Sequence, residues 1–193
     1  MRRERREAVL DAMGKVESTL AGAPIDRERL TMIEAILRRL AARAELFSAE
    51  AFPPPADPTR DSNMYELYRD DRGETTLYVS VAPPGLETPP HDHGTWAVIA
   101  GVRGTEANVF YRRAPDGTLA ATRTVLVERD AAVSLMPKDL HSIRILPTPE
   151  PFFSFHLYGL PFERTRREYR DPATGEWKYF TARPNIRPYD LNG

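Results

Sequence analysis

Seven short apolar stretches, separated by glycine, proline and aspartate, follow one another at roughly regular intervals between residues 74 and 160. Short strands with turn residues between them are typical of an antiparallel sandwich or barrel. APDG at 114–117 predicts a hairpin turn between two of these strands. We therefore expect a mainly β fold, with a late turn or hairpin at 171–180. The expected strands are 74–82, 96–102, 106–113, 119–128, 131–137, 141–147 and 152–160.

The first fifty residues have a helical pattern instead. Apolar residues recur there at helical spacing in two groups, which AGAPI at 21–25 separates. Asp26 is the expected N-cap of the second helix. The arginine-rich start of the chain is expected to be a solvated face rather than a partner-binding arm. The apolar positions are Val9, Leu10, Met13, Val16 and Leu20, then Leu30, Ile33, Ile36, Leu37 and Leu40, and the arginines are Arg2, Arg3, Arg5 and Arg6.

The division of the chain follows from this change of pattern. FPPPADPTR at 52–60 is rich in proline and predicts a stiff linker. We expect an N-terminal helical segment, 1–51, packed on a β-barrel domain, 52–193, in a single structural unit overall. A length of 193 residues suits one domain with a small appendage.

Composition argues against several classes of function. A formal net charge of −1 gives no reason to expect a nucleic-acid partner. No apolar run approaches the roughly 18 residues of a membrane span, and the basic start lacks a signal-peptide core, so we expect a cytoplasmic protein without membrane partners. The absence of cysteine excludes disulfides, thiolate metal sites and a cysteine nucleophile. A metal ion would therefore be held by His, Asp, Glu or backbone oxygen.

The chain has four histidines, and two of them, His91 and His93, are one residue apart. On a strand, residues i and i+2 point to the same face, so both rings could address one point while Asp92 faces away. His141 opens a later strand and could supply a third ligand. A lone histidine is more often a core or surface residue, and the H-x-H spacing favours a metal site. Imidazoles suit Fe(II), Zn(II), Ni(II) or Cu(II), and three of them leave positions open for substrate.

The segment around this pair resembles the first sequence motif of the cupin superfamily. Gly85 lies six residues before His91, and Gly104 lies eleven residues after His93, as in that motif. The later PKDLH resembles the second motif in a version one residue shorter. The resemblance covers roughly residues 75 to 160. It implies a cupin double-stranded β-helix, or jelly-roll barrel, to which the N-terminal α-helices are added.

One departure from the cupin motif bears on the ligands. Ala97 takes the place of the usual glutamate, and the next residue is not a carboxylate either. Three histidines without the glutamate, followed by S-x-H-x-Y, resemble the thiol dioxygenases of the superfamily, which include cysteine dioxygenase and bacterial 3-mercaptopropionate dioxygenases. That family implies one Fe(II) per chain, with Zn(II) or Ni(II) as alternatives in purified protein. The implied ligands are His91, His93 and His141.

The S-x-H-x-Y motif lies within FFSFHLYG. On a strand its three polar residues alternate onto one face, and the intervening Phe153, Phe155 and Leu157 take the other. The resemblance implies that the polar residues form a hydrogen-bonded triad beside the metal. The alternative is a polar stripe that is satisfied inside a barrel. The triad residues are Ser154, His156 and Tyr158.

Two arginines are candidates for binding a substrate carboxylate. Some bacterial members of the family have an arginine nine residues after the tyrosine, and Arg167 holds that place after Tyr158. The mammalian group uses an arginine before H-x-H, where Arg69 lies. The family often has a cysteine near the place of Ala97, linked to the tyrosine, and its absence here favours the bacterial type. We favour Arg167, and the alternative is a surface basic cluster.

The implied function is a non-haem Fe(II) thiol dioxygenase, an oxidoreductase that adds both atoms of O2 to a small mercapto-carboxylate and yields its sulfinate. The substrate would be cysteine or similar to 3-mercaptopropionate, and a homodimer is left open. One alternative is a cupin metalloenzyme that uses the same three histidines for a non-sulfur dioxygenase, isomerase or hydrolase reaction. Another is a metal- or ligand-sensing module. Trp96 and Phe110 are expected in the core rather than in a pocket.

Overall fold

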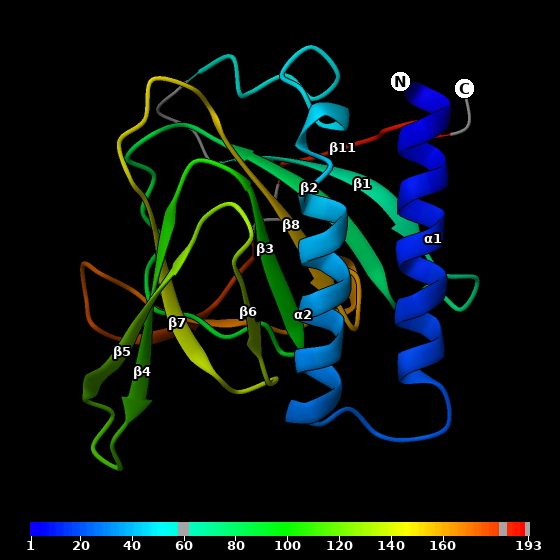
Figure 1. Ribbon diagram of the computed structural model, residues 1–193. Coiled ribbons are helices and arrows are strands. Elements are labelled where there is room, and N and C mark those ends of the chain that lie inside the picture. The colour runs from blue at the N-terminus through cyan, green and yellow to red at the C-terminus, as the bar shows by residue number, and fades with distance from the viewer. Residues whose placement is uncertain (58–61, 182–184, 192–193) are drawn as a thin grey trace.

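The structure is a computed structural model that describes residues 1–57, 62–181 and 185–191. Two α-helices come first and short strands follow, as Figure 1 shows. The helices are α1 (Arg2–Leu20) and α2 (Arg27–Ala41), with 3-10 turns η1 (Ala44–Leu46) and η2 (Phe162–Arg164). The strands are β1 (Asn63–Arg69), β2 (Thr76–Ala82), β3 (Ala97–Arg103), β4 (Glu106–Arg113), β5 (Leu119–Val127), β6 (Ala132–Leu135), β7 (Leu140–Ile145), β8 (Phe152–Tyr158), β9 (Glu168–Arg170), β10 (Trp177–Tyr179) and β11 (Asn185–Arg187).

Most of the strands form two sheets that face each other. The larger sheet has the order β11-β1-β2-β8-β3-β6, and the smaller has the order β5-β4-β7. Neighbouring strands are antiparallel, except that β1 and β11 are parallel. β9 and β10 form a separate hairpin. Two antiparallel sheets face each other and two helices precede them, so the prediction of a mainly β jelly roll with N-terminal helices is confirmed.

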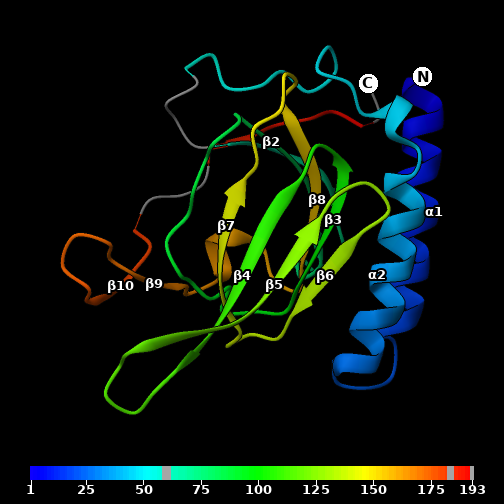
Figure 2. The same ribbon diagram turned by 60° about the vertical axis from the view of Figure 1, so that its left-hand side comes forward.

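The larger sheet is buried on both faces because it lies between the helices and the smaller sheet (Figure 2). On its outer face, Val98 of β3 and Phe155 of β8 belong to one apolar cluster with Leu37 of α2. On its inner face, Ile99 of β3 belongs to a second cluster with Phe110 of β4. Alternate residues of one strand therefore enter different cores. Within the described residues, neither helix combines the length and apolar composition needed to cross a membrane.

The local sequence signals correspond closely to the structure. The seven predicted strands are present, with ends that differ by at most two residues from those expected. The predicted turn joins β4 to β5, where Gly117 has a φ of 84° and its N–H donates to Ala114 O at 2.9 Å. Asp26 caps α2, since its Oδ1 accepts from the backbone N–H of Arg29 at 2.8 Å. The β9–β10 hairpin lies where a late hairpin is expected.

Some features of the structure depart from what the sequence predicts. Phe52, the first residue of the predicted stiff linker, is fully buried, and its ring centroid lies 5.4 Å from that of Tyr65. The last part of that stretch, 58–60, lies outside the described residues. Arg5 is buried rather than solvated, with its Nε donating to Leu46 O at 2.6 Å. Leu10 is exposed on α1, and neither β1 nor β11 was predicted.

Candidate metal centre

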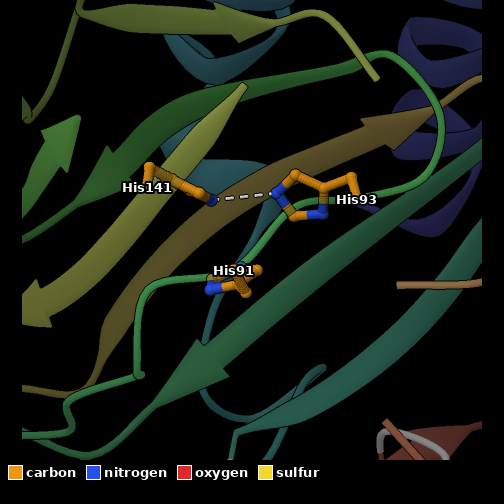
Figure 3. A group of neighbouring side chains, drawn as sticks. All are labelled: His91, His93 and His141. Carbon is orange, nitrogen blue, oxygen red and sulfur yellow. Dashed lines mark hydrogen bonds between the residues drawn. The ribbon is translucent and has the colours of Figure 1, made fainter. Parts of the chain in front are cut away.

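Three histidines from two separate segments of the chain meet between the sheets. His91 and His93 lie in the segment between β2 and β3, and His141 lies in β7. Their rings gather around one point in Figure 3, and one ring nitrogen from each lies within 4.8 Å of the others. All three side chains are buried, that of His141 completely. The group contains no carboxylate, in keeping with Ala97 at the place of the usual cupin glutamate.

His91 and His93 do not lie on a regular strand, and only a short extended stretch carries them. His91 forms an isolated bridge with His141, in which the His91 N–H donates to His141 O at 2.8 Å and the His91 carbonyl oxygen accepts from the His141 N–H at 3.0 Å. Gly94, with a φ of 62°, then ends the extended stretch. This short stretch suffices to place the two imidazoles on one side and Asp92 on the other.

Hydrogen bonds to the outer ring nitrogens decide which nitrogens face the centre. His91 Nδ1 lies 2.8 Å from Pro89 O, and His141 Nδ1 lies 2.8 Å from Asn108 Oδ1. Because oxygen accepts in both contacts, each Nδ1 carries the ring proton and each Nε2 keeps its lone pair. His93 Nε2 lies 2.9 Å from His141 Nε2 (Figure 3). Two nitrogens that bind one cation at about 2.1 Å in neighbouring positions lie roughly 3 Å apart, so this spacing suits a shared ion.

The partner of His141 is part of a buried hydrogen-bonded chain on β4. Asn108 Nδ2 donates to Glu106 Oε1 at 2.8 Å, and both residues are almost completely buried. This bond fixes the amide so that its oxygen faces His141. Burial raises the pKa of Glu106 to about 7. This pair is not among the residues predicted from the sequence, although Glu106, Asn108 and Phe110 alternate along a strand and so place two polar residues on an inward face.

Burial also keeps the imidazoles neutral. It lowers the pKa of His91 to about 4 and holds the pKa values of His93 and His141 well below their usual range. Repulsion from the neighbouring histidines adds to burial for His93 and His141. Neutral imidazole is the form that binds a metal ion, so this cluster can bind one at neutral pH.

Ser154, His156 and Tyr158 lie along the inner face of β8, while the residues that alternate with them, Phe153, Phe155 and Leu157, lie in the outer cluster. Ser154 Oγ lies 3.0 Å from His156 Nε2, and His156 Nδ1 lies 2.9 Å from the Tyr158 hydroxyl. Burial lowers the pKa of His156 to about 3, so the ring carries a single proton at neutral pH. Burial raises the pKa of Tyr158, so the phenol keeps its proton.

Tyr158 connects this stripe to the three histidines. Its ring centroid lies 5.1 Å from that of His93. On the neighbouring strand, Ala97 pairs directly with Tyr158. The position at which the resemblance places a tyrosine-linked cysteine is therefore beside the tyrosine, and here it holds a methyl group.

Arg167 also lies beside the cluster. Its guanidinium lies 4.5 Å from the ring centroid of Phe162 and 4.7 Å from that of Phe180. The Phe180 ring lies close to both groups, since its centroid is also 5.9 Å from that of His91, and the charge of Arg167 adds to burial in lowering the pKa values of His91 and His93. Burial lowers the pKa of Arg167 itself. Within the described part of the chain, its guanidinium makes no ion pair.

Arg69, the other candidate for a substrate carboxylate, is already paired. Its NH2 lies 2.6 Å from Glu66 Oε2, and its NH1 pairs with Glu163. Two carboxylates thus balance its single charge, and a substrate would have to displace one of them.

Trp96 and Phe110 lie in the core, as the sequence analysis favours. Trp96 belongs to the outer cluster and packs so closely on Gly159 that a Cβ there would lie 2.1 Å from the indole Nε1. Phe110 belongs to the inner cluster, with its ring centroid 6.0 Å from that of His141.

No protein-family model matches the sequence. Similar solved structures include a cupin superfamily protein from Desulfitobacterium hafniense, with 9% identity, a TM-score of 0.43, and coverage of 61% of this chain and 87% of that one. A protein with a double-stranded β-helix domain from Klebsiella pneumoniae has 14% identity, a TM-score of 0.42, and coverage of 69% and 88%. The 11S globulin from Wrightia tinctoria has 8% identity, a TM-score of 0.46, and coverage of 64% and 30%. At these values the likenesses say nothing about ligand or reaction.

Proposed function

We propose that this protein is a thiol dioxygenase that converts a small mercapto-carboxylate and O2 into the corresponding sulfinate. The reaction joins one thiol to one O2, so that both oxygen atoms end on sulfur and no further reductant is needed. One observation carries the proposal. Three buried, neutral histidines without a carboxylate lie beside a Ser–His–Tyr stripe and a partly buried arginine that has no acidic partner among the described residues.

The donor set fits a single divalent cation. The outer nitrogens of His91 and His141 are held by oxygen acceptors, which orients both rings toward the centre. We assign Fe(II) to this site as part of the proposal, since imidazole ligands also suit other metals. Bound iron would favour the deprotonated form of the substrate thiol and supply redox chemistry for O2. Because the three imidazoles carry no charge, they would leave the 2+ charge of the ion uncompensated, and that charge would attract an anionic thiolate.

The chain's own polar residues define an oriented hydrogen-bond donor. Ser154 Oγ lies 3.0 Å from His156 Nε2, and His156 Nδ1 lies 2.9 Å from the Tyr158 oxygen. As part of the proposal we take the tautomer in which Ser154 donates to Nε2 and the Nδ1 proton is donated to the Tyr158 oxygen. The Tyr158 O–H is then left to donate into the site, toward the sulfur or oxygen atoms of the reactants. All three residues lie on one strand whose other face is packed against the helices, so their geometry is held firmly.

Arg167 favours an anionic substrate. A partly buried guanidinium without an acidic partner is unfavourable until an anion binds it. A carboxylate matches the guanidinium fork with two parallel hydrogen bonds. A mercapto-carboxylate would place its carboxylate on Arg167 and its sulfur at the histidines, and this two-point binding would orient the thiol for reaction.

A panel of thiols in an oxygen electrode tests the proposal. Protein refilled anaerobically with Fe(II) receives cysteine, 3-mercaptopropionate or the neutral 2-mercaptoethanol. We expect wild type to take up O2 with at least one mercapto-carboxylate. In Arg167→Ala the KM for that substrate should rise at least about tenfold, while the iron content stays unchanged. Arg69→Ala is the matched control and should leave that KM unchanged. Turnover of non-sulfur substrates only, or by the Zn or Ni form, would instead assign another reaction to the same histidines.

A further inference from the structure

We propose that Asp92, the residue between two of the candidate ligands, is a positioning residue that sets the distance between Arg167 and the three histidines. Through that distance it selects the length of the mercapto-carboxylate that the site accepts. This inference rests on the proposed function, because it takes Arg167 as the carboxylate anchor and the histidines as the sulfur site.

Asp92 holds the residue next to Arg167 at two points. Its side chain is almost completely buried, and Oδ1 accepts from the backbone N–H of Glu168 at 3.0 Å. The backbone N–H of Asp92 donates to Glu168 O, also at 3.0 Å. The second carboxylate oxygen accepts from Lys138 Nζ at 2.8 Å. Asp92 therefore points away from the ligands and toward the strand that follows Arg167.

Neighbouring contacts leave little freedom for this strand to shift. The N–H of Arg170 donates to Pro90 O at 2.8 Å, and Tyr169 forms an isolated bridge with His91. At Gly94 a Cβ would lie only 2.4 Å from the backbone oxygen of Arg166. Residues 166–170 thus lie directly against residues 90–94, which carry two of the histidines.

The side chain of Arg167 is held as well as its backbone. Phe162 and Phe180 both lie close to its guanidinium, with their ring centroids at 4.5 and 4.7 Å. The N–H of Phe180 donates to Arg167 O at 3.1 Å, and the Phe180 ring centroid lies 5.9 Å from that of His91. A substrate bound at both ends must span the fixed gap between guanidinium and imidazoles, so one chain length should fit best.

Four variants separate this role from a general effect on folding. Asp92→Ala removes both acceptor oxygens, and Glu168→Pro removes the opposing N–H from the other side of the contact. Asp92→Asn keeps an oxygen that can accept from Glu168 N–H and loses the charge together with the acceptor for Lys138. Lys138→Ala removes the mostly exposed partner of Asp92 and is the matched control.

Steady-state kinetics are measured for mercaptoacetate, 3-mercaptopropionate and 4-mercaptobutyrate, with mercaptoethanol as the thiol that lacks a carboxylate. We expect wild type to prefer one length by about tenfold or more in KM, the order of discrimination that one methylene group gives. Asp92→Ala and Glu168→Pro should lose most of that preference, whereas their iron content and their KM for the neutral thiol should stay unchanged. Asp92→Asn and Lys138→Ala should keep the preference.

An unchanged length preference in both Asp92→Ala and Glu168→Pro would overturn the inference, as would an equal rise in KM for the neutral thiol. Backbone hydrogen exchange of the metal-free protein provides a readout that does not depend on turnover. Asp92→Ala should speed exchange in residues 166–170 and leave α1 and α2 unchanged. If wild type oxidised no thiol, the proposed function would fail. Faster exchange of residues 166–170 in Asp92→Ala would still support the positioning role of Asp92. Unchanged exchange there would refute it.

Discussion

The hydroxyl of Tyr158 lies at the junction of the Ser–His–Tyr stripe and the histidine cluster. In the proposed tautomer, its hydrogen bond with His156 uses one lone pair of the oxygen and leaves the O–H for the reactants. In Tyr158→Phe this donor is lost while the ring is kept, so we expect kcat to fall by roughly 100-fold, comparable to the loss of one donor at other reactive sites. Steady-state kinetics and iron analysis on the same preparation provide the measurement.

Ser154→Ala is the companion variant to Tyr158→Phe. It removes the donor that fixes the His156 tautomer and should lower kcat less, because the imidazole still contacts Tyr158. A Tyr158→Phe enzyme with normal kcat, or one that has lost its iron, would contradict the role given to the hydroxyl.

Asn108 is the residue whose loss should weaken metal binding without removing a ligand. It orients His141 through the 2.8 Å contact with Nδ1. For Asn108→Ala we expect an Fe(II) dissociation constant about 10 to 100 times higher, the usual effect of losing such a partner. Anaerobic competition with a chelator measures it. Glu106→Gln, which keeps an acceptor for the Asn108 amide, is the control, and an equal loss in both variants would show a general disturbance of β4 instead.

The His91–His93 pair and the Ser–His–Tyr stripe are visible in the sequence because their spacing is local, whereas His141 joins the pair only through the resemblance to the cupin motifs. Residues i, i+2 and i+4 share a face of β8 whatever the rest of the fold does. Asn108 and Asp92 escaped because their partners, His141 and Glu168, are distant in the chain. Arg69 and Arg167 could not be separated from spacing alone, since only the fold places two carboxylates on one and two aromatic rings on the other.

At the scale of elements, α2 is held by its buried face against the larger sheet. Leu37 is completely buried in the outer cluster, whereas Met32 on the same helix is 52% exposed. Leu37→Ala should reduce the free energy of unfolding by about 2 to 5 kcal/mol, and Met32→Ala by less than about 0.5 kcal/mol. Urea unfolding at fixed pH measures both. Equal effects of the two substitutions would mean that α2 does not pack on the sheet through this face.

The strands that the sequence predicts are those with local turn signals and runs of apolar residues. β1 was missed because its pattern is broken by an irregularity between Glu66 and Tyr68, where the register against β2 shifts. β11 is a very short strand that pairs with β1, from which it is far removed in the chain. Such strands exist through long-range pairing and packing rather than through their own sequence.

For the molecule as a whole, burial of ionisable groups makes the stability of the metal-free protein depend on pH. All four histidines have folded pKa values below their usual 6.5, through burial first. Below that pH the unfolded chain binds more protons than the folded one, so acid destabilises the fold by up to about 1.4 kcal/mol per histidine per pH unit. Glu106, whose pKa is raised to about 7, acts in the opposite direction between pH 7 and its usual 4.5.

The destabilising effect of four histidines is larger than the stabilising effect of one carboxyl. The urea concentration at the unfolding midpoint of the metal-free protein should therefore decrease as the pH is lowered from about 7.5 to about 5. Glu106→Gln should make that fall steeper, because it removes the group that gains stability in acid. A midpoint that stays constant or rises over this range would show that the imidazoles are not buried in the neutral form.

The central claim is that three imidazoles hold one iron at which a mercapto-carboxylate gains both atoms of O2. Mass spectrometry of the product formed under 18O2 tests it most directly. Iron-loaded wild type should give a sulfinate that carries two 18O atoms, in proportion to the O2 consumed, and His91→Ala should bind no iron and form none. A product with one labelled oxygen or none, or equal product from His91→Ala, would contradict the account.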